Sequence, residues 1–287
     1  MLMPTPLDGL RVVSLATNVP GPVAAARLRA MGAQVTKVEP PSGDYLALVA
    51  RGWHAALIAG QVVVRLDLKS VHGRAALDQQ LGQADILITS HRPAALERLG
   101  LATATMRTRF PRLCVVSIVG AAGKDADRPG HDLTYQAAAG LVAPPAMPTS
   151  LFADIATGEA AVSAALALVV QRARTGHGGD VEVGMTEVAA RLAAPRRHGL
   201  TTSGGVLGGE LPMYALYAAS DGWIAVAALE PHFAERLGAA LGLDVPSHDE
   251  LTRTFAVRRA GEWAAWARAH DLPLEIVSSA TGEMVGP

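Results

Sequence analysis

Short runs of β-branched residues alternate along this chain with longer segments rich in Ala and Leu. The short runs are continuously apolar, which is typical of strands buried on both faces of a parallel sheet. We expect strands at 11–15, 34–38, 62–66, 85–88, 113–118 and 181–183. We expect helices at 22–31, 72–81, 94–99, 133–142 and 155–174. This order predicts an α/β fold with a Rossmann-like, doubly wound large domain.

The pattern changes after Ala194. Four glycines within 201–209 are incompatible with a helix or a central strand, so we expect a loop there. Beyond it, Ser220-Asp221-Gly222 lies between two strand-like runs and predicts a hairpin, and helical patterns follow at 233–241 and 261–270. We therefore expect a large domain at 1–195, a Gly-rich linker at 196–212 and a small α+β domain at 213–287.

Charge and motifs exclude several classes of function. The formal net charge is -1, which argues against nucleic acid or an anionic membrane as a partner. The segment 16–22 after the first strand is not G-x-G-x-x-G, so we expect no NAD site of the usual kind. The 9 histidines lack the paired spacing of metal ligands, so we expect no metal.

Cys114 is the single cysteine, so the chain cannot form an internal disulfide, which fits a reducing compartment. No activating base lies near it in the sequence, and we expect a buried strand thiol. Polar residues precede any apolar segment at the N-terminus, which argues against a secretory signal. The apolar stretch 160–170 is shorter than the roughly 20 residues that span a bilayer. We expect a cytoplasmic protein without a membrane segment.

Several segments, in order over most of the chain, resemble the class III CoA-transferases of the CaiB/BaiF type, a family that includes α-methylacyl-CoA racemases. One segment is 129–133, with Gly130-His131-Asp132, and another is 153–158, with Asp154. The others are 6–13, 21–22, 31–41, 66–69, 92–101 and 174–178.

The resemblance implies that coenzyme A is bound as a substrate by the large domain, with an acyl-CoA and a small carboxylic acid as reactants. It also implies an interlocked homodimer. Trp263 and Trp266, which we expect to be exposed, would then be buried against a second subunit. Family members are generally longer, so the stretch from His131 to Asp154 and the C-terminal end are expected to be shortened.

Asp154 precedes a strongly apolar helical pattern. From the residues alone it is an N-cap, where a carboxylate accepts hydrogen bonds from free N–H groups. By resemblance it matches the family's nucleophilic aspartate. Such a carboxylate attacks an acyl thioester to give a mixed anhydride, and CoA thiolate then forms an aspartyl-CoA thioester.

Two further residues match catalytic positions. His131 matches the histidine that pairs with the aspartate in racemases, where two bases act on opposite faces of the carbon next to the thioester. Its alternative interpretation is a local hydrogen-bonding residue at a helix start. Glu230 matches a glutamate of the small domain near the acyl site, and its alternative is a residue that begins a helix before Pro231.

Binding positions are also implied by the resemblance. Gly208 and Gly209 match the glycine loop that covers the site, where close-lying backbone N–H groups can stabilise an oxyanion; the alternative is a plain linker. CoA carries phosphates, which need cations and backbone donors. The expected CoA-binding residues are Thr17, Asn18, Leu66, Lys69, Ser90, Arg92, Arg98 and Arg128. For Lys69, Arg92 and Arg98 a solvated surface position is the alternative.

Three functions remain open at this point. The first is an acyl-CoA:carboxylate CoA-transferase that uses Asp154. The second is an α-methylacyl-CoA racemase that uses His131 and Asp154. The third is a catalytically silent CoA-binding paralogue.

Overall fold

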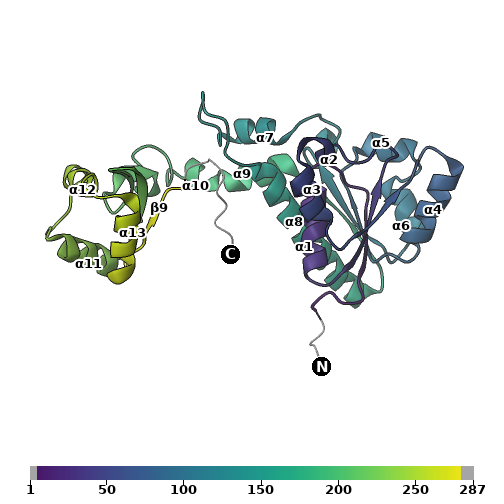
Figure 1. The fold of residues 1–287 in the computed structure, drawn as a ribbon. Coiled ribbons are helices and arrows are strands. Elements are labelled where there is room, and N and C mark those ends of the chain that lie inside the picture. Colours follow the sequence, from purple (N-terminus) through teal and green to yellow (C-terminus); the bar gives the residue numbers. More distant parts are fainter. Residues whose placement is uncertain (1–4, 279–287) are drawn as a thin grey trace. The chain divides into compact units, whose positions relative to one another are not determined.

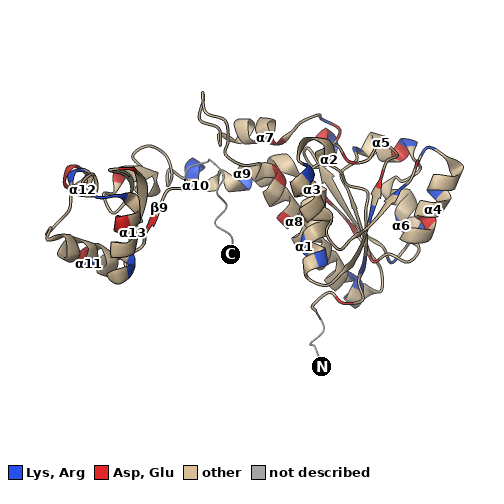
Figure 2. Ribbon diagram, in the orientation of Figure 1, with Lys and Arg blue, Asp and Glu red and all other residues tan. Residues whose placement is uncertain are grey.

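The computed structural model describes residues 5–278, and the chain divides into two compact units between Ala193 and Ala194 (Figure 1). We call the N-terminal part unit 1 and the C-terminal part unit 2. Basic and acidic residues are interspersed along the helices of both units (Figure 2).

Unit 1 is built on a six-stranded parallel sheet with the order β3-β2-β1-β4-β5-β6. This is the order of a doubly wound Rossmann-like sheet, so the predicted fold class is confirmed. Each predicted strand is present, with bounds that differ by at most one residue. The strands are β1 (Arg11–Ser14), β2 (Gln34–Glu39), β3 (Val62–Arg65), β4 (Ile86–Thr89), β5 (Cys114–Val119) and β6 (Asp180–Gly184).

The prediction that the strands are buried on both faces is correct at the centre of the sheet and wrong at its edge. Every residue of β4 and β5 is buried. In contrast, β3 pairs only with β2, and Val62 and Val63 are exposed. The prediction of a doubly buried strand is therefore wrong for β3, because a continuously apolar run does not reveal that a strand lies at an edge.

Helices cover both faces of the sheet (Figure 1). On one face α1 (Pro20–Ala30) and α8 (Phe152–Thr175) pack over β1, β2, β5 and β6. On the other face lie α4 (Val71–Leu81), α5 (Pro93–Arg98) and α6 (Thr103–Arg109). The remaining helices of unit 1 are α2 (Leu46–Val49), α3 (Arg51–Ile58), α7 (Asp132–Ala139) and α9 (Met185–Leu192). The sequence patterns did not predict α2, α3, α6 and α9.

Helix α8 has 24 residues, and within residues 5–278 it is the one helix long and apolar enough to cross a membrane by length and composition. The apolar stretch 160–170 is therefore part of a longer helix than the sequence pattern suggested. Its buried residues Ala161, Val162, Ala165 and Leu168 belong to the main core of unit 1, as in the core helix of a globular domain.

Unit 2 contains an antiparallel sheet of β7 (Tyr214–Ala219), β8 (Gly222–Ala227) and β9 (Leu274–Ile276). The predicted hairpin is confirmed, since β7 and β8 pair around Ser220 and Asp221. The helices of unit 2 are α10 (Ala194–Arg197), α11 (Pro231–Leu241), α12 (His248–Phe255) and α13 (Ala260–Ala269). The predicted C-terminal shortening falls partly on 279–287, outside the described residues.

Trp263 lies in the core of unit 2 and is only 2% exposed. Its ring packs between Phe255 and Trp266, with centroid distances of 5.0 and 5.3 Å, and its Nε1 donates a hydrogen bond to the Phe255 carbonyl. The expectation that Trp263 and Trp266 are exposed is wrong, because both complete an aromatic cluster within their own unit. The predicted homodimer consequently depends on the family resemblance alone.

Helices α1 and α8 approach each other closely at Gly158. A Cβ atom at this position would lie 2.7 Å from Val23 Cγ1 and 2.8 Å from the carbonyl oxygen of Pro20. Real Cβ atoms do not make contacts this short, and the Pro20 carbonyl belongs to the backbone. Only glycine therefore permits the observed spacing of the two helices.

Gly158→Ala is expected to destabilise unit 1 by about 1–3 kcal/mol, because α1 and α8 must move apart, although Ala is the better helix former by about 1 kcal/mol. Gly52→Ala in α3 is the matched control, since nothing lies within 4 Å of its Cβ position. That variant should be neutral or slightly stabilising. Urea unfolding followed by circular dichroism measures both, and equal midpoints would contradict the packing argument.

Candidate active site

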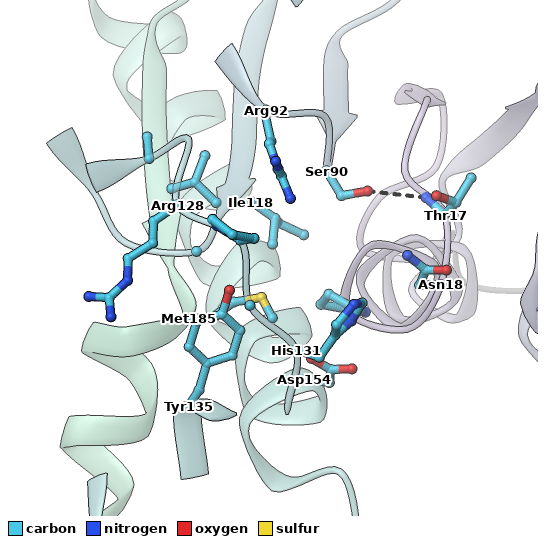
Figure 3. A pocket seen from close by; sticks show the side chains of 16 residues that line it. Thr17, Asn18, Ser90, Arg92, Ile118, Arg128, His131, Tyr135, Asp154 and Met185 are labelled. Carbon is cyan, nitrogen blue, oxygen red and sulfur yellow. Dashed lines mark hydrogen bonds between the residues drawn. The ribbon is translucent and has the colours of Figure 1, made fainter. Parts of the chain in front are cut away.

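A pocket lies at the carboxyl end of the parallel sheet, where the strand order reverses between β1 and β4. At such a point the loops after neighbouring strands diverge and leave a crevice in which α/β proteins bind ligands. The segment after β1 contributes Thr17 and Asn18, and the segment after β4 contributes Ser90 and Arg92 (Figure 3). The Thr17 N–H donates a hydrogen bond of 3.2 Å to Ser90 Oγ, which joins these two walls.

The pocket brings together seven of the residues that the sequence singled out. They come from four different parts of unit 1 and are Thr17, Asn18, Ser90, Arg92, Arg128, His131 and Asp154. Leu66 and Lys69 instead line a second pocket, together with Glu39 and Pro40 from the end of β2. Arg98 is exposed on α5 and lines neither pocket, so its alternative interpretation as a surface residue is the one that the geometry favours.

Glu230, Gly208 and Gly209 lie in unit 2. Glu230 is exposed and immediately precedes α11, in agreement with its alternative as a residue that begins a helix. Gly209 has φ 91°, and a Cβ on Gly208 would overlap the Thr202 carbonyl, so both glycines are required by a tight backbone. A short, kinked stretch of helical turns occupies Val206–Glu210, within the segment expected to be an irregular loop.

Asp154 is not an N-cap. Helix α8 begins at Phe152, and Asp154 is its third residue, in the first turn. Its backbone N–H donates a hydrogen bond of 3.0 Å to Oδ1 of Asp132, a buried residue at the start of α7. The capping function expected of Asp154 is thus supplied by a carboxylate from another helix, and the Asp154 side chain lines the pocket.

Asp132 contacts the candidate site through Asp154, and sequence reasoning missed this contact. Its Oδ2 accepts a hydrogen bond from Gln136 Nε2, and Gln136 also donates to the Ser150 carbonyl at 3.1 Å. Asp132 and Gln136 therefore tie the first turn of α7 to the first turn of α8. Asp132 stood in a segment quoted for the family resemblance, but sequence spacing could not show that it contacts a residue 22 positions away.

His131 immediately precedes α7 and is exposed. Its backbone N–H donates to Thr134 Oγ1 at 3.1 Å, which fixes the start of this helix. Both His131 and Asp154 line the pocket, and their side chains lie on the same side of it (Figure 3).

The electrostatics of the pocket favour a proton on Asp154. Burial, together with the nearby negative charge of Asp132, raises the pKa of Asp154 from the ordinary value of 3.8 to about 7. Tyr135, also in the pocket, has its pKa raised by burial and by Asp154, while Arg92 and Arg128 lower it. A carboxyl group with a pKa near 7 exchanges readily between its neutral and ionised forms, which suits a catalytic group.

Two predictions about other groups can be compared with the structure. Cys114 is fully buried on β5, as expected, and burial raises the pKa of its thiol. The ligand atoms of Glu39, Asp44 and His54 lie within 4.8 Å of one another, a cluster that histidine spacing alone did not reveal. Lys37 lies in the same cluster and pairs with Asp44.

The fold and the pocket are those of an α/β enzyme whose site lies at the carboxyl ends of parallel strands. Residues 7–284 match the model of CoA-transferase family III, and the chain belongs to this family. Members of the family act on CoA thioesters and carboxylates.

The individual relatives include both racemases and CoA-transferases. The chain is 30% identical to the human alpha-methylacyl-CoA racemase over 88% of its own length and 68% of the racemase. It is 28% identical to the succinate–glutarate CoA-transferase of Agrobacterium fabrum over 89% of its length and 71% of that protein. Among solved structures, the hypothetical protein Rv3272 of Mycobacterium tuberculosis has a TM-score of 0.82 and 26% identity, with 97% and 87% of the two chains covered. Family membership alone therefore does not decide between transferase and racemase.

Asp154→Asn is expected to change how stability depends on pH. Because the pKa of Asp154 is about 7 in the folded chain and 3.8 in the reference state, folding favours its protonated form. This contribution is fully present below pH 4 and is lost as the pH rises through 7. The variant should therefore be more stable than the wild type at pH 8, by roughly 2–4 kcal/mol, and the advantage should shrink towards pH 4. Thermal unfolding across this range measures it; an advantage independent of pH would contradict the raised pKa.

Proposed function

We propose that this chain is an acyl-CoA:carboxylate CoA-transferase that works through an aspartyl-CoA thioester on Asp154. The observation that carries the proposal is the placement of Asp154. Its carboxylate lines the pocket at the strand-order reversal, while its backbone N–H is held by Asp132. Within residues 5–278 its carboxylate oxygens receive no hydrogen bond from another side chain, which leaves them available for attack on a bound acyl group.

The reaction then follows from covalent catalysis. An Asp154 oxygen attacks the thioester carbonyl carbon, and the carbon–sulfur bond breaks to release CoA thiolate and leave a mixed anhydride. The thiolate attacks the carbonyl carbon of Asp154, which frees the first acid and forms the aspartyl-CoA thioester. The acceptor carboxylate repeats the same two steps in reverse order, so that a new acyl-CoA leaves and the Asp154 carboxylate is restored.

CoA binding is assigned to the cations that the two pockets provide. Arg92 and Arg128 line the first pocket, and Lys69 lines the second. Guanidinium and ammonium groups suit the phosphates of CoA. Arg98 is omitted from this set because it lines neither pocket.

The racemase is the second candidate function, and one observation favours it. His131 and Asp154 line the same pocket, and two bases that act on one carbon must do so. The identity to the human racemase supports the same alternative. The raised pKa of Asp154 is compatible with either function, because a nucleophile and a general base both need access to the ionised form.

Asp154→Asn is expected to lower CoA transfer by about 10³-fold or more, because an amide cannot form the anhydride. Transfer is measured with labelled acyl-CoA and a series of free carboxylic acids. Hydroxylamine added during turnover should label Asp154 in the wild type, since it attacks an activated aspartyl ester. Asp8→Asn, at an exposed position, is the matched control and should leave transfer unchanged. Near wild-type transfer by Asp154→Asn would refute the proposed mechanism.

His131→Ala separates the two candidate functions. In a transferase it should leave most of the exchange of CoA between acids, since Asp154 carries the covalent chemistry. In a racemase it should abolish the exchange of the α-proton of a branched acyl-CoA with deuterated water, because one of the two bases is lost. Mass spectrometry of the recovered acyl-CoA measures both reactions on one sample. Wild-type protein that performs neither reaction, but binds CoA, would indicate a catalytically silent paralogue.

CoA binding is expected to weaken as salt rises, because exposed cations that meet phosphates are screened. Calorimetric titration at about 50 and 500 mM salt should show the loss in the wild type. Lys69→Ala should reduce both the affinity and the salt dependence, whereas Arg98→Ala, outside both pockets, should reduce neither. An affinity indifferent to salt would contradict the assignment of the cations.

A further inference from the structure

A cluster of buried charges lies next to the candidate site and has no role in the chemistry proposed for Asp154. Lys37 and Glu39 project from β2, Asp44 follows in the next loop, and His54 lies on α3. Lys37 is 1% exposed and Asp44 is 2% exposed. Burying charges costs free energy unless they are paired and hydrogen-bonded. The contacts of these side chains therefore indicate what the cluster does.

The contacts within the cluster identify Lys37 as its central cation. Its Nζ lies 2.5 Å from Asp44 Oδ2 and 3.8 Å from Glu39 Oε1, and His54 Nε2 lies 3.4 Å from the same Glu39 oxygen. The carboxylates and the histidine are close enough together to suggest a metal site. However, the Lys37 ammonium contacts both carboxylates and the Arg65 guanidinium lies 3.8 Å from Glu39 Oε2, so two cations balance the two carboxylates without a metal ion.

The second oxygen of Asp44 reaches the wall of the candidate site. Asp44 Oδ1 accepts hydrogen bonds from the backbone N–H groups of Asn18, at 3.1 Å, and Leu46, at 3.0 Å. Asn18 has φ 67°, in the left-handed region that residues other than glycine adopt only at a cost in energy. The hydrogen bond that the Asn18 N–H donates to Asp44 stabilises the Thr17–Asn18 peptide in this unfavourable conformation.

The same cluster also reaches the second pocket. Thr17 and Asn18 line the pocket of Asp154, whereas Glu39 lines the pocket of Lys69. The buried ionic group on β2 and the loop after it thus contacts residues of both pockets, through Asp44 at the first and Glu39 at the second. A long ligand such as CoA would extend across both pockets if it bound as proposed above.

We propose that Lys37 and Asp44 are positioning residues that hold the Thr17–Asn18 peptide in the conformation required to bind CoA. Lys37 fixes and neutralises one oxygen of Asp44, and the other oxygen fixes the Asn18 N–H. The identity of the ligand rests on the proposed function. The positioning of the Thr17–Asn18 peptide does not rest on the proposed function, because it follows from the contacts within the chain itself.

Both oxygens of Asp44 receive donors, and this determines the test. Lys37 contacts Oδ2 of Asp44, whereas the Asn18 N–H contacts Oδ1. The amide of Asp44→Asn has a single oxygen, which can take only one of these two positions and so faces either Lys37 or the Asn18 N–H. Lys37→Met removes the competing donor, and the amide oxygen is then free to face Asn18. Glu39 keeps His54 and Arg65 nearby in that variant, the latter at 3.8 Å. The second substitution is therefore expected to rescue the first.

The first measurement is calorimetric titration with CoA, at a temperature well below every unfolding midpoint. Asp44→Asn should raise the dissociation constant for CoA by about tenfold, because one hydrogen bond to a charged group is lost. Lys37→Met/Asp44→Asn should return to within about threefold of the wild type, in keeping with a restored hydrogen bond. Leu81→Ala, a buried position on α4 outside both pockets, is the control for stability and should lower the unfolding midpoint without changing the dissociation constant. A merely structural role would make Asp44→Asn behave like Leu81→Ala, and that result would overturn the proposal.

The second measurement needs no ligand. Hydrogen exchange of the peptide that contains Thr17 and Asn18 should become faster in Asp44→Asn and return towards the wild-type rate in the double variant. If Asp44→Asn does not fold, Lys37→Met/Asp44→Leu replaces it, because it differs from the rescued variant only in lacking the acceptor for Asn18. Equal exchange in that pair would refute the proposal. Failure of the wild type to bind CoA, with the exchange effects intact, would refute the proposed function and leave the hold on the peptide standing.

Discussion

The candidate site depends on the parallel direction of all six strands of unit 1. Because the strands run the same way, every strand ends at one edge of the sheet, and residues distant in the sequence meet there. The reversal of strand order between β1 and β4 then separates the loops that carry Thr17 and Ser90. Without both conditions, Asp154 at the start of α8 would face a closed layer of loops instead of a pocket.

Two groups of acidic side chains, one in the site and one beside it, differ in how their charge is balanced. Asp132 and Asp154 lie close together near the pocket, and the pKa of Asp154 rises to about 7 because burial and a second carboxylate disfavour its ionised form. Asp44 and Glu39 are buried more deeply but share the Lys37 ammonium. The presence of a neighbouring cation thus distinguishes the paired carboxylates of Asp44 and Glu39 from the carboxylate of Asp154, whose pKa is raised.

The sequence was sufficient to locate the strands and the hairpin, because a continuous apolar run or a Ser-Asp-Gly turn is a local signal. It was not sufficient to predict burial, which depends on the tertiary contacts of each side chain. Val62 and Trp263 have apolar side chains in either setting, and only the tertiary structure shows that the first is exposed at an edge and the second is buried. Helix α3 was missed because it has only 8 residues and carries Gly52, a poor helix former, in its first turn.

The candidate site was likewise predicted only in part, because local signals identify its residues but not the contacts between them. Asp154, His131 and Arg92 were identified through the order of several segments, and the structure brings them to one pocket. The hydrogen bond of Asp132 to Asp154 and that of Asp44 to Asn18 each join positions more than 20 residues apart. No local rule predicts such pairs, although Asp132 stands next to His131, which the sequence did single out.

The contact between Gly158 and the Pro20 carbonyl has a consequence for the evolution of this site. Asp154 lies one helical turn before Gly158, and Asn18 lies two residues before Pro20, so one backbone contact sets the distance between the two sides of the pocket. Backbone atoms in contact cannot be respaced by exchanging side chains. Adaptation of the pocket to larger or smaller ligands is therefore expected at the other walls, such as those of Tyr135 and Met185, where a change of side chain alters the volume directly.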